Sequence, residues 1–214
     1  RRIVDNLRRF LKYALTTNAA EVWLVFVAPL LGLPMPLLPI QLLWINLVTD
    51  GLPGLALAAE PAEPDVMQRP PRPPSENVLA RGLAVHALWV SVLMAGLGIA
   101  TLAGGVAMGS DAWQTMVFTG LAVAQLGHVL AIRSERESLF TQGLGSNPAL
   151  LATVAAMLAL QLAAVYVPAM NALLHTAPLG ATELALTIGA GSIVFLAVEL
   201  EKWIRRRKEL PCER

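Results

Sequence analysis

Apolar residues fill six stretches of the chain, and short polar segments separate them. Each stretch is near the roughly 20 residues that a helix needs to cross the hydrocarbon core of a bilayer. The stretches lie at about residues 13–33, 38–58, 82–107, 113–132, 148–169 and 182–200. The pattern predicts an all-α membrane protein, in which residues 1–214 form one domain built as a bundle of six transmembrane helices.

Composition and charge agree with this prediction. Hydrophobic residues make up 56% of the chain and charged residues 14%, which is typical of a multi-pass membrane protein. In a six-span arrangement all 16 Lys and Arg residues fall on one side, before the first span, at 69–81, at 133–136 and after the sixth span. Positive residues stay in the cytoplasm, so we expect both termini to be cytoplasmic. We expect the protein to reside in the plasma (inner) membrane.

The same distribution bears on partners. The net charge is only +1, and the basic residues are explained as determinants of topology. We therefore expect membrane lipid as a partner and no nucleic acid.

Two segments between or after the spans differ from the rest. Residues 59–77 are rich in proline, which excludes a continuous helix, and we expect a rigid cytoplasmic loop there; a proline-rich ligand for another protein is the alternative. Residues 201–214 form a basic tail with a lone cysteine, Cys212, which has no second cysteine for an internal disulfide.

Asp50 places a carboxylate inside the second apolar stretch. An ionisable side chain at that depth is costly and marks an ion or proton pathway by default. Gly51 and Pro53 follow directly, so we expect the second helix to unwind near Asp50 and Gly51. Exposed carbonyls beside a carboxylate would bind a cation.

Other polar residues share helix faces with these groups. Residues three or four apart lie on one face of a helix, and this spacing relates the polar side chains within each of the first two spans. Carboxylate, amide and hydroxyl oxygens suit a hard cation such as Ca²⁺ and suit a transition metal poorly. The predicted cation ligands are Asn18, Glu21, Asn46, Thr49, Asp50 and Gln125.

A structural interpretation of the neutral ligands is the alternative, because Asn and Thr often hydrogen-bond between membrane helices. That interpretation is weaker for Glu21 and Asp50, since a carboxylate has no inexpensive structural role at this depth. We interpret His128 as a polar contact and His86 as structural.

The run Asn46-Leu-Val-Thr-Asp50-Gly-Leu-Pro53, followed by the proline-rich segment from Asp65, resembles the sixth transmembrane helix and the next loop of P-type cation ATPases of the calcium-pump type. Asn18-Ala-Ala-Glu21 is similar to the ligand pair of that family's fifth helix. The resemblance extends over nearly the whole chain, and it implies that the six spans are family helices five to ten.

The resemblance implies a function and a set of partners. It implies the cation-binding transmembrane half of an ATP-driven pump, with Ca²⁺ as the transported ion. ATP and Mg²⁺ would act only through domains absent from this chain. The expected partners are the phosphorylation, nucleotide-binding and actuator domains and helices one to four.

One departure from the family leaves the number of ions open. Gln125 stands where the reticulum-type calcium pump, which binds two Ca²⁺, has a glutamate. Relatives that move one Ca²⁺ also have glutamine at this position, whereas Glu21 favours two.

Two other functions remain open at this stage. A secondary cation or proton antiporter also uses carboxylates near the middle of the membrane and broken helices. A stand-alone membrane domain that binds a cation without transporting it is the second alternative.

Overall fold

The computed structural model describes residues 1–58, 60–61, 82–133 and 147–209, and within this part of the chain the regular elements are all helical. The elements are α1 (Arg2–Leu30), α2 (Pro39–Trp44), η1 (Ile45–Asp50), α3 (Gly51–Ala58), α4 (Leu83–Ala107), α5 (Trp113–Ala131), α7 (Pro148–Tyr166), α8 (Pro168–Leu174) and α9 (Ala181–Glu209). Six helical segments are long and apolar enough to cross a membrane. The prediction of a six-helix transmembrane bundle is confirmed.

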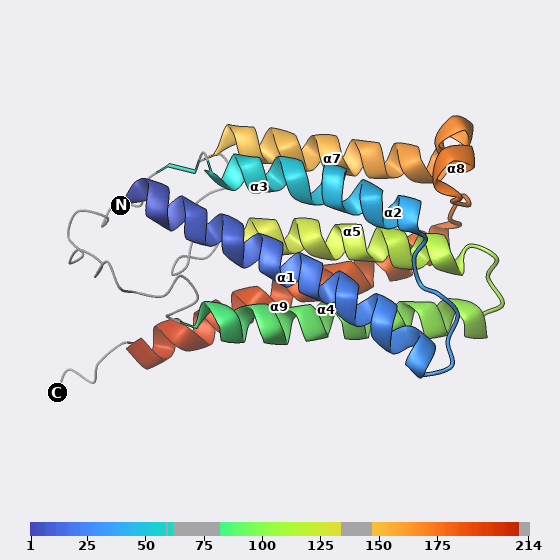
Figure 1. The fold of residues 1–214 in the computed structure, drawn as a ribbon, viewed down its shortest axis with the longest axis horizontal. Coiled ribbons are helices and arrows are strands. Elements are labelled where there is room, and N and C mark those ends of the chain that lie inside the picture. Colours follow the sequence, from blue (N-terminus) through green and yellow to red (C-terminus); the bar gives the residue numbers. More distant parts are fainter. Residues whose placement is uncertain (59, 62–81, 134–146, 210–214) are drawn as a thin grey trace.

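The six spans run along one long axis, and both termini lie at the same end of the bundle (Figure 1). α5 is the central helix, because 72% of its most apolar window is buried, against 22% for α9. α1 packs on α4, and α9 packs on both α4 and α5. The close approach of α5 and α9 depends on Gly191, where an added Cβ would lie 2.8 Å from the Cβ of Val123; small residues permit such contacts between membrane helices.

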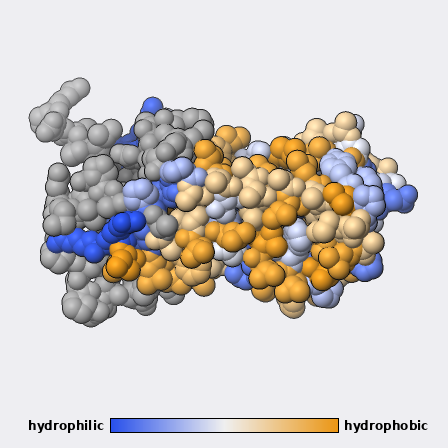
Figure 2. All heavy atoms as spheres, turned by 90° about the horizontal axis from the view of Figure 1, so that it is seen from above, coloured by the Kyte–Doolittle hydropathy of each residue, from blue (hydrophilic) through white to orange (hydrophobic). Residues whose placement is uncertain are grey.

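The outer surface matches an apolar solvent. Large side chains such as Phe26, Leu47 and Leu196 are 62–70% exposed. Figure 2 shows hydrophobic residues gathered over the middle of the bundle on the face in view. A soluble protein rarely exposes apolar patches of that extent, so the chain is an integral multi-pass membrane protein.

The second span stays helical throughout, which corrects the prediction that it unwinds near Asp50 and Gly51. Residues 45–50 form a π-helix, and Gly51 continues with helical dihedral angles of −63° and −52°. Pro53 has no N–H, so the carbonyl of Thr49 lacks the donor that an α-helix would supply four residues later. The Tyr13 hydroxyl lies 3.1 Å from that carbonyl and takes the place of the missing donor.

The helix ends differ from the expected spans for local reasons. α7 stops at Tyr166 because Pro168 holds the preceding Val167 in an extended conformation (ψ 120°), and α8 begins at that proline. α9 runs past residue 200 into the basic tail, where Glu201 pairs with Arg205 one turn later and adds support to the helix.

The first residues of the proline-rich loop are fixed at the end of the bundle that holds the termini. The Glu60 carboxylate accepts hydrogen bonds from Arg133 (Nη2, 3.0 Å) and Asn147 (Nδ2, 2.6 Å), and the Glu60 carbonyl accepts one from Asn6 (2.8 Å). This network, here called the Glu60 clamp, joins the chain beyond α3 to the ends of α1, α5 and α7. The rest of the predicted loop, residues 62–77, lies outside the described residues, as does Cys212.

Candidate cation site

Glu21 lies on α1 at the point where three helices meet. Its Oε2 accepts a hydrogen bond from Asn46 Nδ2 of η1 at 2.6 Å, and its Oε1 accepts one from Gln125 Nε2 of α5 at 3.0 Å. The carboxylate is 5% exposed. Residues that are 104 positions apart in sequence thus meet at one acidic group in the interior of the bundle.

Asp50 ends the π-helix on the same side of α1. Its Oδ2 accepts a hydrogen bond from the Thr17 hydroxyl at 2.8 Å, and its Oδ1 lies 3.0 Å from the Tyr13 hydroxyl. The side chain is 8% exposed. A π-helix has one more residue in each hydrogen-bonded turn than an α-helix and often occurs at functional sites; here it brings Asp50 to the donors of α1.

The two carboxylates define the electrostatics of the cluster. Asp50 contacts Thr17, which lies one helical turn before Glu21 on α1, so the two carboxylates lie about one turn apart and both are buried. Like charges at such a separation repel one another. Within the part of the chain that the structure describes, the contacts of these two groups are with neutral amide and hydroxyl donors. A cation between them would offset the repulsion, and buried charges require such compensation.

Gln125 contributes a second kind of evidence. Its side chain is fully buried, and its Oε1 has no hydrogen-bond partner among the described residues. An unpaired buried polar atom costs free energy, whereas a metal ion would accept that oxygen as a ligand.

The structure assembles part of the predicted ligand set. Glu21 is in contact with Asn46 and Gln125, and Asp50 lies about one helical turn away, against Thr17. Thr49 is buried in the same π turn. Asn18 is exposed, and its amide donates to the Ala14 carbonyl of its own helix at 2.7 Å, so it does not join the cluster among the described residues.

Two residues of the site were missed in the sequence. Tyr13 and Thr17 precede Glu21 by eight and four positions, which places all three on one face of α1. The spacing was visible, but a tyrosine near the predicted start of a span also fits an interfacial anchor. The hydroxyl contacts with the second span decide between these roles.

The bundle and this cluster define a class, the integral membrane proteins that hold carboxylate and amide side chains together between their helices. The comparison with known families makes the assignment specific. The family described as "Cation transporting ATPase, C-terminus" matches residues 34–204. The chain belongs to this family, which confirms the resemblance seen in the sequence.

Curated relatives agree with that assignment. The chain is 38% identical over 199 residues to a calcium-transporting ATPase of Bacillus subtilis (strain 168), covering 90% of this chain and 22% of the relative. It is 34% identical over 211 residues to calcium-transporting ATPase 1 of Yarrowia lipolytica, covering 96% and 22%. For calcium-transporting ATPase type 2C member 2 of Mus musculus the identity is 31% over 215 residues, covering 96% and 23%. The chain therefore spans about a fifth of the length of these relatives.

Proposed function

We propose that this chain is the cation-binding transmembrane half of an ATP-driven P-type pump that moves Ca²⁺ out of the cytoplasm by alternating access. The observation that carries the proposal is the pair of buried carboxylates, Glu21 and Asp50, which neutral donors from three helices hold about one helical turn apart. Their oxygen chemistry suits Ca²⁺. The names of the relatives, which are calcium-transporting ATPases, favour the same ion.

Cation binding would exchange hydrogen bonds for bonds from oxygen to the ion. In the described arrangement the amide nitrogens of Asn46 and Gln125 point at Glu21. Rotation of each amide would present its oxygen to an ion that the carboxylate also binds. The cost of binding is then the loss of two hydrogen bonds, and the gain is neutralisation of two buried charges.

The remaining parts of the pump would lie outside this chain. The exposed position of Asn18 fits a ligand that completes its site against helices one to four. Phosphorylation, nucleotide-binding and actuator domains would use ATP and Mg²⁺ and change the affinity of the site from a distance, which is a coupling between two sites. We place the pump in the plasma (inner) membrane, with the end that holds both termini in the cytoplasm.

The test uses the full native polypeptide that contains this chain. Asp50→Asn keeps the size of the side chain and removes its charge, so it should abolish Ca²⁺-dependent phosphorylation from ATP. Asp111→Asn removes a charge from the exposed turn between α4 and α5 and should leave phosphorylation unchanged. Normal Ca²⁺-dependent phosphorylation in Asp50→Asn would contradict the site.

The size of the native polypeptide separates the pump from the two alternatives. An antibody against residues 202–214 should detect a band several times heavier than 22.8 kDa. A band at 22.8 kDa would instead favour an antiporter or a stand-alone cation-binding domain.

A further inference from the structure

Two histidines from neighbouring helices meet edge to edge inside the bundle. His86 of α4 and His128 of α5 have Nε2 atoms 3.2 Å apart, their ring centroids are 5.5 Å apart, and their planes are inclined by 20°. Both side chains are almost completely buried. At this separation one Nε2 donates a proton and the other accepts it.

Glu201, which contacts His86, sets the direction of these hydrogen bonds. His86 Nδ1 lies 2.8 Å from Oε2 of Glu201 on α9, and a carboxylate accepts, so His86 donates from Nδ1. In a neutral imidazole the other nitrogen is then the acceptor, and His128 donates to it from Nε2. The remaining nitrogen, His128 Nδ1, carries no proton and has no hydrogen-bond partner among the described residues.

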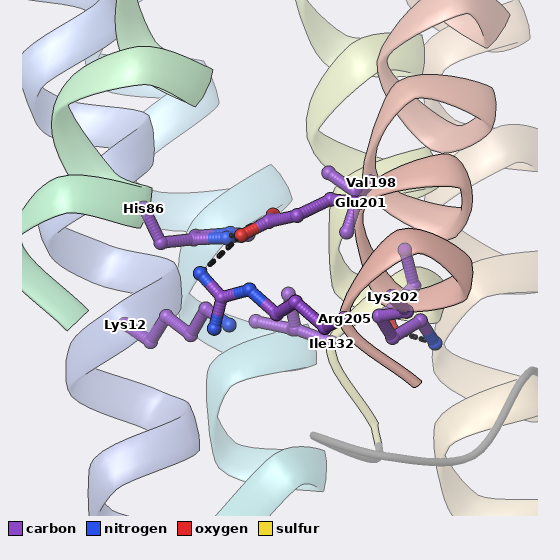
Figure 3. Close-up of a pocket in the computed structure, with 8 residues that line it drawn as sticks. Lys12, His86, Ile132, Val198, Glu201, Lys202 and Arg205 are labelled. Carbon is purple, nitrogen blue, oxygen red and sulfur yellow. Dashed lines mark hydrogen bonds and ion pairs between the residues drawn. The ribbon is translucent and has the colours of Figure 1, made fainter. Parts of the chain in front are cut away.

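The two ends of the hydrogen-bonded row His128–His86–Glu201 lie in different surroundings. At the inner end, the His128 ring stacks on Tyr13 with centroids 5.9 Å apart, and the Tyr13 hydroxyl contacts Asp50. At the outer end, Glu201 borders a cavity with room for about one water molecule. Figure 3 shows His86 and Glu201 meeting at this cavity, with Lys12 and Arg205 below them.

The charged and titratable groups that face the pair come from two elements, α1 and α9. Lys12 and Tyr13 face it from α1, and Glu201 and Arg205 face it from α9. Lys202, also on α9, lines the cavity but donates to the Ala131 carbonyl at 2.8 Å. Glu201 is therefore the acidic group through which the pair reaches the cavity.

We propose that His128, His86 and Glu201 form a proton shuttle between the interior of the bundle, beside the cation cluster, and the cavity near the chain termini. A hydronium ion that reaches the interior gives up a proton to Nδ1 of His128, and the Nε2 proton of His128 moves to Nε2 of His86. The Nδ1 proton of His86 then moves to Oε2 of Glu201 and leaves to water in the cavity. Each transfer breaks one bond to hydrogen and forms one, and the sum is one proton moved.

The same geometry limits the shuttle to single protons. After a transfer, the hydrogen bonds that join His128, His86 and Glu201 point the opposite way. Both imidazoles must therefore rotate before a second proton can follow in the same direction. His128 is stacked against Tyr13, and His86 is in edge contact with Trp89 at 5.7 Å. These contacts slow the rotation that resets the shuttle, and they therefore limit the rate at which successive protons can pass. The role of the shuttle within a transport cycle rests on the proposed function.

The test compares glutamine variants of the full polypeptide in sealed vesicles that contain a pH-sensitive dye. Glutamine can keep a hydrogen bond but cannot accept a proton on one atom and release one from another. His128→Gln and His86→Gln should retain Ca²⁺-dependent phosphorylation from ATP. We expect ATP-driven Ca²⁺ uptake by the wild-type protein to be accompanied by proton movement in the opposite direction, and this proton movement should slow by about a hundredfold in both variants, the low end of the usual contribution of a positioned acid–base group.

His175→Gln is the matched control, because this exposed histidine follows α8 at the opposite end of the bundle. Proton movement at the wild-type rate in both test variants would overturn the shuttle. Absence of Ca²⁺-dependent phosphorylation in the wild-type protein would instead overturn the proposed function.

A spectroscopic measurement tests the shuttle independently of transport. In ¹⁵N-histidine-labelled protein, magnetic resonance should detect one imidazole protonated at Nδ1, a second protonated at Nε2, and a coupling between nitrogens across their hydrogen bond. The same tautomer in both rings, or no coupling, would overturn the shuttle even in an active pump.

Discussion

The Tyr13 hydroxyl contacts the Thr49 carbonyl, whose usual α-helical donor is missing. Thr49 would receive a hydrogen bond from residue 53 in an α-helix, but Pro53 has no N–H, and Tyr13 lies 3.1 Å from the Thr49 carbonyl oxygen. Tyr13→Phe keeps the ring that stacks on His128 and removes only the hydroxyl. The variant therefore measures the contribution of this hydroxyl to the free energy of unfolding.

The expected loss of stability in Tyr13→Phe follows from the Thr49 carbonyl, which would remain unpaired. A buried acceptor without a donor costs about 1–3 kcal/mol. The Asp50 carboxylate lies within 3.0 Å of the same hydroxyl, but a single proton serves both acceptors, so the loss is counted once. We expect Tyr13→Phe to lower the free energy of unfolding by about 1–3 kcal/mol, measured by unfolding of the full polypeptide in lipid nanodiscs.

Pro53→Ala supplies the matching test, because alanine restores an N–H that can bond to the Thr49 carbonyl. The double variant Tyr13→Phe/Pro53→Ala should therefore lose less stability than the two single changes added together. A coupling of about 1 kcal/mol or more is typical of residues that share a partner. Additive losses would refute the argument that Tyr13 replaces the donor missing at Pro53.

Three further changes have defined outcomes. Gln125→Ala should weaken Ca²⁺ affinity, measured as the Ca²⁺ dependence of phosphorylation, by less than Glu21→Gln, because a neutral ligand attracts a cation less than a carboxylate does; equal losses would contradict this ranking. Glu60→Gln should lower the free energy of unfolding by about 3–5 kcal/mol, because it removes the charge that pairs with buried Arg133; unchanged thermal unfolding would show that the Glu60 clamp is dispensable. Gly191→Ala should destabilise by about 1–3 kcal/mol through overpacking, whereas Gly189→Ala, where the added Cβ meets nothing within 4 Å, should be neutral in the same assay.

The spans were predictable because lipid leaves few solutions for the backbone. A segment that cannot hydrogen-bond to its solvent must form a helix, so apolar length alone located all six. Glu21 was predictable as a site residue for a related reason, since a carboxylate at that depth needs a partner. The direct contact of Glu21 with Gln125, 104 positions away, was not predictable from any local pattern, although the family resemblance had marked Gln125 as a candidate ligand.

The form of the second span was not predictable from its own residues. Pro53 removes a donor, and from the sequence alone this indicated a break. The span nevertheless stays helical across Pro53, and Tyr13, on a different helix, donates to the Thr49 carbonyl that Pro53 cannot serve. The meeting of His86 and His128 was equally hidden, because their distance depends on how α4 and α5 are rotated about their axes, and a single histidine within a span carries no sign of its partner.

The continuity of α1 has a mechanical consequence. Tyr13, Thr17 and Glu21 stand on one uninterrupted helix, and eight residues of α-helix extend about 12 Å. A twist of this rod about its axis would withdraw the hydroxyls from Asp50 and turn Glu21 away from Asn46 in a single motion. The two carboxylates would then lose their neighbours together, so a torque applied to one end of α1 would switch the whole cluster as a unit.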